Sequence, residues 1–239
     1  MSTIPYYISE MSKYQDVAII VPVYNEGQVV AEVVNEVASI FPNIICINDG
    51  SADNSAEEVG KTPAVLIDHP INLGQGAAIQ TGIEYALANP KIQYFVTFDA
   101  DGQHNIKDVP VMLDHLKNKQ LDIVIGSRFM GIIHNISPVK KAFLVLAHIF
   151  SAFDSGINLS DPHIGLRVFN RKFAEGLNIT MPDFEHASEI VHRIKEGNYA
   201  YGEMPVSVTY TDYSKAKGQP MLNAVNITFD LLLNRITKR

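Results

Sequence analysis

Cysteine and tryptophan are nearly missing from this chain. The 239 residues contain a single cysteine, Cys46, and no tryptophan. One thiol can form neither an internal disulfide nor a multi-cysteine metal cluster, so both cross-links are excluded and a reducing compartment is favoured. Because Cys46 lies in the apolar stretch 44–47, we expect a buried core residue rather than a reactive thiol.

Excess positive charge and long apolar runs are missing as well. A formal net charge of -7 argues against a nucleic-acid partner, which would require a basic face to neutralise phosphates. Apolar runs such as 142–147 fall far short of the ~20 residues that span a bilayer, and the start of the chain does not resemble a signal peptide. We therefore expect a cytoplasmic protein that rests at most on the inner face of a membrane.

Apolar and amphipathic segments alternate in the first half of the chain. Their periodicities predict strands and helices in turn, which is typical of an α/β fold with a doubly wound, mainly parallel sheet and helices on both faces. The predicted strands lie at 17–21, 44–47, 65–67, 94–98 and 123–125, and the predicted helices at about 28–40, 75–87 and 106–116.

The alternation weakens after Gly126, but no linker or internal repeat separates a second domain. We therefore expect one domain over residues 1–239. The second half is predicted to contain a basic amphipathic segment at 139–153, strands at 166–169 and 206–210, and helices at 185–195 and 222–236.

Polar clusters follow three of the predicted strands, at 24–26, 48–51 and 99–101. In open α/β sheets, ligands bind outside the carboxyl ends of the strands. The third cluster holds two carboxylates, Asp99 and Asp101. In extended chain alternate side chains share a face, so Asp99, Asp101 and Gln103 are expected to point the same way and to hold Mg²⁺ or Mn²⁺ through oxygen ligands.

The segments 21–26, 48–51, 72–76 and 99–101 occur in this order at successive strand ends. The series resembles the GT-A glycosyltransferases of sequence family two, over residues 17–217, and within them the branch of dolichol-phosphate mannose synthases and bacterial polyprenyl-phosphate hexosyltransferases. The resemblance implies a GT-A, Rossmann-like fold. It also implies a nucleotide and metal half at about 17–126, an acceptor half at 127–217 and an amphipathic C-terminal extension at 218–239.

The resemblance further implies an inverting hexosyltransferase that uses a UDP or GDP sugar, a divalent cation and a polyprenyl phosphate acceptor. It assigns catalytic roles to Asp101, Arg128 and Lys215. The implied ligands of the nucleotide sugar are Pro22, Tyr24, Glu26, Asp49, Gly76 and Asp99, with Asp49 at the nucleobase; those of the metal are Asp99, Asp101 and Gln103; those of the acceptor phosphate are Arg128, Lys140, Lys141, Arg167, Ser214 and Lys215. Relatives often carry Lys or Arg where this chain has Gln75.

Simpler interpretations of these cations stay open. Arg128 could pair with an aspartate, Lys140 and Lys141 could begin an ordinary helix, and the segment 213–218 could be a plain surface loop. The final helix could pack on the body of the fold, lie on an anionic membrane or dock a small membrane protein, and a homo-oligomer is also open.

A second function would transfer the sugar to a saccharide hydroxyl. A hydroxyl acceptor requires a base, for which Glu185 and Asp183 are the candidates, whereas a phosphate acceptor is already anionic. Glu189, further along the same predicted helix, is expected to be solvated. A third hypothesis, a non-catalytic subunit that binds nucleotide sugars, is opposed by the retained pair of repelling carboxylates.

Overall fold

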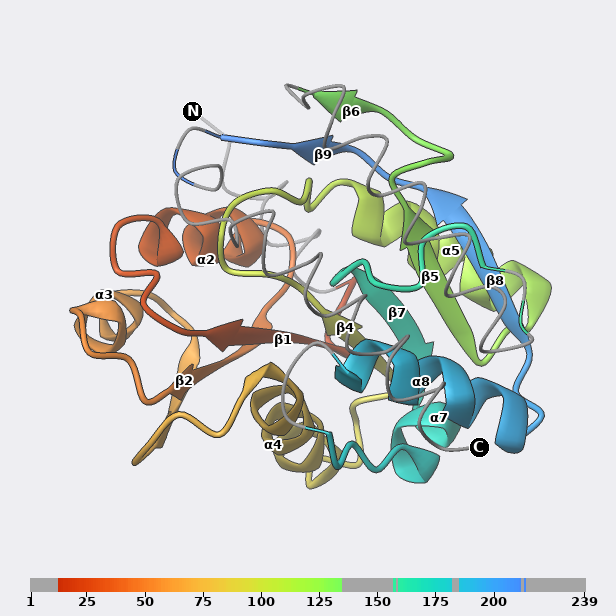
Figure 1. Ribbon diagram of the computed structural model, residues 1–239, viewed down its shortest axis with the longest axis horizontal. Helices are drawn as coiled ribbons and strands as arrows, with labels where there is room; N and C mark the ends of the chain where they lie inside the picture. The colour runs from red at the N-terminus through yellow and green to blue at the C-terminus, as the bar shows by residue number, and fades with distance from the viewer. Residues whose placement is uncertain (1–12, 135–156, 158, 182–184, 212, 214–239) are drawn as a thin grey trace, which may run out of the picture.

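The computed structural model describes residues 13–134, 157, 159–181, 185–211 and 213, and Figure 1 shows their arrangement. Strands and helices alternate through the first half, as the apolar pattern predicts. The strands are β1 (Val17–Val23), β2 (Asn43–Asp49), β3 (Val65–His69), β4 (Tyr94–Thr97), β5 (Ile123–Ser127), β6 (Ile133–His134), β7 (Arg167–Asn170), β8 (Tyr201–Pro205) and β9 (Val208–Thr209); the helices are α2 (Val30–Ala38), α3 (Ser55–Gly60), α4 (Gln75–Leu87), α5 (Asp108–Lys119), α7 (Arg171–Gly176) and α8 (Glu185–Glu196).

Seven strands form one mixed sheet in the order β3-β2-β1-β4-β7-β5-β8. Every neighbouring pair is parallel except those of β7, which runs antiparallel to both β4 and β5. The mainly parallel sheet of the sequence prediction is therefore confirmed. Strand β7 comes from the second half of the chain but lies between two strands of the first half.

Buried apolar side chains fill both faces of the sheet. In β1 every residue except Pro22 is buried, as a strand covered on both faces requires. Cys46 in β2 is fully buried, which confirms its expected place in the core, and burial raises the pKa of its thiol to about 12. In Figure 1, α2 and α5 lie on one side of the sheet, and α4, α7 and α8 lie on the other.

Each helix presents its apolar stripe to the sheet. Val30, Val33, Val34 and Val37 of α2 are all buried and recur at helical spacing. In α4 Gly82 allows close packing, because a Cβ there would collide with Ile20 and Ile47 of the strands beneath. None of the helices in the described part of the chain is long and apolar enough to cross a bilayer.

Candidate active site

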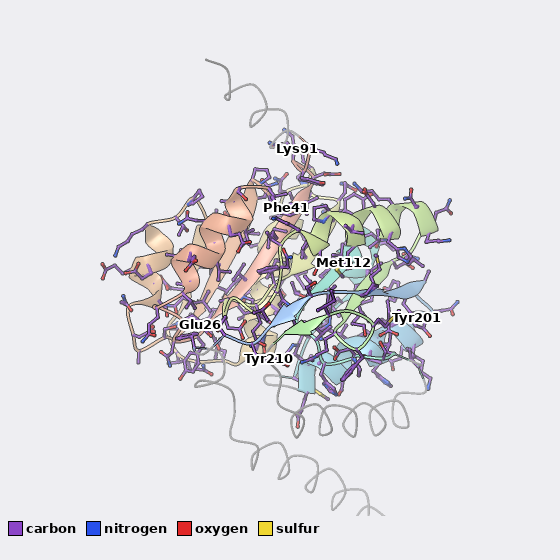
Figure 2. All side chains as sticks on the ribbon, turned by 90° about the horizontal axis from the view of Figure 1, so that it is seen from above. Glu26, Phe41, Lys91, Met112, Tyr201 and Tyr210 are labelled. Atoms are coloured by element: carbon purple, nitrogen blue, oxygen red, sulfur yellow. The ribbon has the colours of Figure 1, made fainter. Side chains whose placement is uncertain are left out.

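The carboxyl ends of β1, β2, β4 and β5 meet at one edge of the sheet. Asp49 and Ser127 are the last residues of β2 and β5. Because β7 is antiparallel, its first residue, Arg167, also lies at this edge. Figure 2 shows Glu26 and Tyr210 toward this end, whereas Phe41 and Lys91, which precede β2 and β4, lie toward the opposite end.

Asp99, two residues beyond β4, is held from two sides. His104 Nε2 donates to its Oδ2 over 2.9 Å, and Gln75 Nε2, from the start of α4, donates to its Oδ1 over 3.2 Å. Gly165 lies so close that a Cβ at that position would overlap the carboxylate. Burial opposes the charge of Asp99, but the hydrogen bond from His104 and the guanidinium of Arg167 hold its pKa below the usual range.

Asp101 lies in a turn rather than in extended chain, so the prediction of alternating side chains is wrong in its premise. The chain turns at residues 100 and 101, and Gly102 has a φ of +73°. The carboxylate of Asp101 accepts from the backbone N–H of Gln103 over 3.1 Å and also from the side-chain amide of Gln103. Burial and the charge of Asp99 raise the pKa of Asp101 to about 6.

The turn offers two carboxylates and one amide as oxygen donors for a cation. Within the described residues no group of three or more His, Cys, Asp and Glu side chains is close enough to form a complete cage. Mg²⁺ usually takes one or two carboxylates and completes its shell with waters and substrate phosphates, and Mn²⁺ suits the same oxygen ligands. The donor set of two carboxylates and one amide oxygen therefore fits Mg²⁺ or Mn²⁺.

Arg167 is a fully buried cation at the same edge. Its side chain is among the largest that are fully buried in the described chain, and its Nη2 donates to the carbonyl of Pro162 over 3.3 Å. Its Nη1 is buried without a hydrogen-bond partner. Burial lowers the pKa of Arg167 to about 10, against the opposing influence of Asp99 and Asp161. The opposite charges of Asp99 and Asp161 offset part of the cost of burying this guanidinium.

Asp49 anchors the glycine loop that precedes α4. Its Oδ1 accepts from the N–H of Leu73 over 2.9 Å and contacts His69 Nδ1 over 2.8 Å, and its Oδ2 accepts from the N–H of Gly74 over 2.8 Å. Three of the roughly four acceptor positions of a carboxylate are thus used within the protein. The predicted contact of Asp49 with a nucleobase would have to use the fourth.

The loop after β1 is tied to the loop after β2. The N–H of Asn25 donates to Ser51 Oγ, and the N–H of Glu26 donates to Ser55 Oγ. Tyr24 remains 47% exposed and Pro22 is half-buried, so both can line an open pocket. Gly76, in the first turn of α4, is buried behind the glycine loop. Tyr24 and Glu26 thus lie in the loop after β1, whereas Pro22 lies in β1, Asp49 ends β2 and Gly76 lies in α4.

A strap formed by residues 207–211 and 213 crosses the site edge. The N–H of Ser207 donates to Asp108 Oδ2 over 2.8 Å, and the N–H of Thr209 donates to the carbonyl of Gln103 over 2.9 Å. At its far end the Tyr213 hydroxyl donates to a carboxylate oxygen of Glu26. The strap thus joins the turn that carries the carboxylates to the first loop of the chain.

Arg128, directly after β5, is paired with an aspartate. Its Nε and Nη2 grip the two oxygens of Asp161 over 2.6 and 3.0 Å, and its Nη1 donates to the Tyr210 hydroxyl over 3.3 Å. Arg128 therefore forms an ion pair with Asp161, as the simpler interpretation predicted. A guanidinium has five N–H donors, so donors remain for a phosphate contact, and that role stays a prediction.

The candidate bases and the remaining predicted cations differ in where they lie and in whether the structure describes them. Glu185 is exposed at the start of α8. The expectation that Glu189 is solvated is wrong, because its carboxylate is buried and accepts from the N–H groups of Thr180 and Met181. The other predicted residues, Lys140, Lys141, Asp183, Ser214 and Lys215, lie outside the described residues.

Comparisons with known proteins identify the family and the fold. The family model "Glycosyl transferase family 2" matches residues 18–177. The chain belongs to this glycosyltransferase family. An uncharacterized protein of Methanocaldococcus jannaschii is 30% identical to it over 235 residues, with 96% of each chain covered. The UDP-N-acetylglucosamine–dolichyl-phosphate N-acetylglucosaminyltransferase of Methanococcus voltae is 29% identical over 242 residues, which covers 92% of this chain and 96% of the relative.

A solved structure shares the fold of this glycosyltransferase. It is glucosyl-3-phosphoglycerate synthase from Mycobacterium tuberculosis, in complex with Mn²⁺, UDP-glucose and phosphoglyceric acid. The TM-score is 0.64 at 14% identity, with 90% of this chain and 79% of that chain covered. The similarity confirms the predicted GT-A-like architecture.

Proposed function

We propose that this glycosyltransferase moves a hexose from a UDP or GDP sugar to a polyprenyl phosphate, with inversion, at a membrane surface. The observation that carries the proposal is the pairing of opposite charges at one sheet edge. Asp99 and Asp101 lie on one side, and the buried guanidinium of Arg167, with its unpartnered Nη1, lies near Asp99 on the other. Such an edge suits a cation-bound diphosphate next to an anionic acceptor.

The carboxylates have separate tasks in this proposal. Asp101, with a pKa raised to about 6, gains most from a divalent cation, and Asp99, already ionised, sets the negative field around it. When bound, the cation would stabilise the negative charge that develops on the departing diphosphate. Glu26, Tyr24 and Pro22 would hold the nucleoside at the adjoining loop.

The acceptor side relies on cations instead of a base. Arg128 would meet the acceptor phosphate with the donors that Asp161 and Tyr210 leave available, and the buried guanidinium of Arg167 would add positive charge next to Asp99. Because a phosphate oxygen is already anionic, it can attack the anomeric carbon without losing a proton. The relative from M. voltae, whose name specifies a dolichyl phosphate acceptor, supports this choice.

The test is product analysis with labelled UDP and GDP sugars, Mn²⁺ and a short polyprenyl phosphate. We expect one sugar to appear on the lipid phosphate, with inverted anomeric configuration and with complete loss of product in excess chelator. A product on a saccharide hydroxyl, with the lipid phosphate untouched, would replace the proposal by the hydroxyl-transfer function. Binding of nucleotide sugars without any product on either acceptor would indicate a non-catalytic subunit.

A further inference from the structure

His104 is a buried side chain whose position is fixed from several sides. Only 4% of the side chain is exposed. Its ring packs edge-on against Phe98, with ring centroids 5.7 Å apart, and its backbone forms an isolated antiparallel bridge with Val208 of the strap. A ring held in this way has one orientation, so its two nitrogens have fixed surroundings.

The two ring nitrogens of His104 are in different surroundings. Nε2 lies 2.9 Å from Asp99 Oδ2, and Nδ1 is buried without a partner. A carboxylate oxygen accepts hydrogen bonds, so Nε2 is the donor in this contact. Nε2 is thus engaged by Asp99 and is not available to ligate a cation at the turn.

The consequence falls on Asp99. Gln75 donates to its Oδ1 and His104 to its Oδ2, so both oxygens are held by residues outside the turn at 100–101. Asp101, in contrast, is hydrogen-bonded within the turn, by Gln103. Asp99 is therefore held in a fixed position, and Asp101 supplies the second carboxylate of the cation site.

We propose that His104 is a positioning residue of the cation and diphosphate site, which acts by fixing the carboxylate of Asp99. The inference rests on the proposed function, because it assumes that a cation-bound nucleotide diphosphate occupies this edge. Hydrogen-bond partners of metal-binding groups typically contribute 10–100-fold to metal affinity, since they pre-set the orientation of the ligand. A purely structural His104 would change stability and leave this affinity unaltered.

The experiment compares two amide side chains of different length at position 104. In His104→Gln the amide nitrogen can take the place of Nε2, whereas in His104→Asn the shorter side chain leaves Asp99 without this donor. His104→Leu removes the donor entirely. His192→Gln is the matched control, because its side chain is 63% exposed on α8 and pairs with Glu196. Affinities for Mn²⁺ with UDP and with GDP are measured by calorimetry, and melting temperatures are measured on the same samples.

We expect His104→Asn and His104→Leu to weaken Mn²⁺-dependent nucleotide binding by about 10–100-fold, and His104→Gln and the control to stay within about 3-fold of wild type. If His104→Leu does not fold, the comparison of Gln with Asn decides. Equal affinities of these two variants, whatever their melting temperatures, would overturn the positioning role. Wild-type product formation alongside equal affinities would leave the proposed function standing and remove only this inference. A wild type that binds neither nucleotide with Mn²⁺ would overturn both.

Discussion

The hydroxyl of Tyr213 donates to Glu26 Oε2 over 2.8 Å, although the two residues are 187 positions apart in the chain. The pair closes the strap over the loop that follows β1. The nearby carboxylates of Glu26, Asp53 and Asp101, together with burial, raise the pKa of Tyr213, so it remains a donor at every physiological pH. A residue late in the chain thus holds Glu26, a predicted ligand of the nucleotide sugar near the start of the chain.

Tyr213→Phe is expected to weaken nucleotide binding by about 3–10-fold, because Glu26 loses the donor that orients it and a hydrogen bond to a charged group contributes about 1.5–3 kcal/mol before solvent screening. Calorimetric titration with UDP and GDP would measure the change. Tyr85→Phe, at a tyrosine that is 50% exposed on α4, is the matched control. Unchanged affinity in Tyr213→Phe would show that Glu26 is oriented without the strap.

Asp101→Asn should remove nearly all turnover and should also change the pH dependence of stability in the presence of chelator. The unfolded chain releases this proton near pH 4 and the folded chain near pH 6, so the folded state binds more protons between these values. The contribution of Asp101 to the free energy of unfolding of wild type therefore falls as pH rises through this window.

The asparagine cannot ionise and escapes this loss. Relative to wild type in chelator, the variant should gain roughly 1–2 kcal/mol between pH 4 and pH 7, as measured by urea unfolding at both pH values. Addition of Mn²⁺ at pH 7 should stabilise wild type and leave the variant unaffected. Full activity of the variant, or of wild type in excess chelator, would contradict the metal assignment.

Asp161→Ala is expected to lower the free energy of unfolding by about 3–5 kcal/mol, because it leaves the buried guanidinium of Arg128 without its counter-ion. The double variant Asp161→Ala with Arg128→Ala should recover part of this loss, since no unpaired charge remains. Chemical denaturation of the two single variants and the double variant measures the coupling. Additive losses would show that the pair is energetically neutral.

Glu185→Gln distinguishes the two acceptor classes. With a lipid phosphate as acceptor, turnover should remain within about 3-fold of wild type, since no proton has to be removed. With a saccharide hydroxyl as acceptor, loss of the base should lower kcat by about 100-fold or more. Initial-rate kinetics on each acceptor, with donor affinity measured in parallel, decide between them. A collapse on the lipid phosphate with unchanged donor affinity would favour the hydroxyl function.

The sequence predicted the first half of the fold well because each element there carries a strong local signal. Helix α4 has the predicted bounds, and the five strands of this half are present with boundaries shifted by a few residues. The order of strands beyond β4 could not be predicted. Strand β7 (RVFN) is buried at Val168 and Phe169, and such a short buried segment is compatible with parallel or antiparallel neighbours, so its sequence does not indicate its direction.

Four short elements were missed: helices α3 and α7, the two-residue strand β6, and strand β8. Helices α3 and α7 have only six residues each, too few for a helical period to show. Strand β8 contains Gly202 and Glu203 and is only partly buried, so its composition resembles a loop. The predicted strand at 206–210 is present only as the two residues of β9.

The site was predicted by residue type but not by arrangement. The motif around Asp99 and Asp101 places the carboxylates, yet the pairing of Arg128 with Asp161 joins residues 33 positions apart that no local pattern links. The role of His104 was missed although it belongs to the same motif. The sequence shows only that a histidine follows two aspartates. The structure is required to show that this histidine contacts Asp99.

The insertion of β7 between β4 and β5 has a consequence for how the protein is made. A ribosome that has produced residues 17–127 has supplied β1 to β5, but β5 has no partner in the sheet until residues 167–170 emerge. The nascent chain therefore carries an open edge on β4 for about 40 residues of synthesis, a period in which unpaired strands invite association with other chains. Because Arg167 arrives on the strand that closes this gap, the cation opposite Asp99 is installed in the same event that completes the sheet.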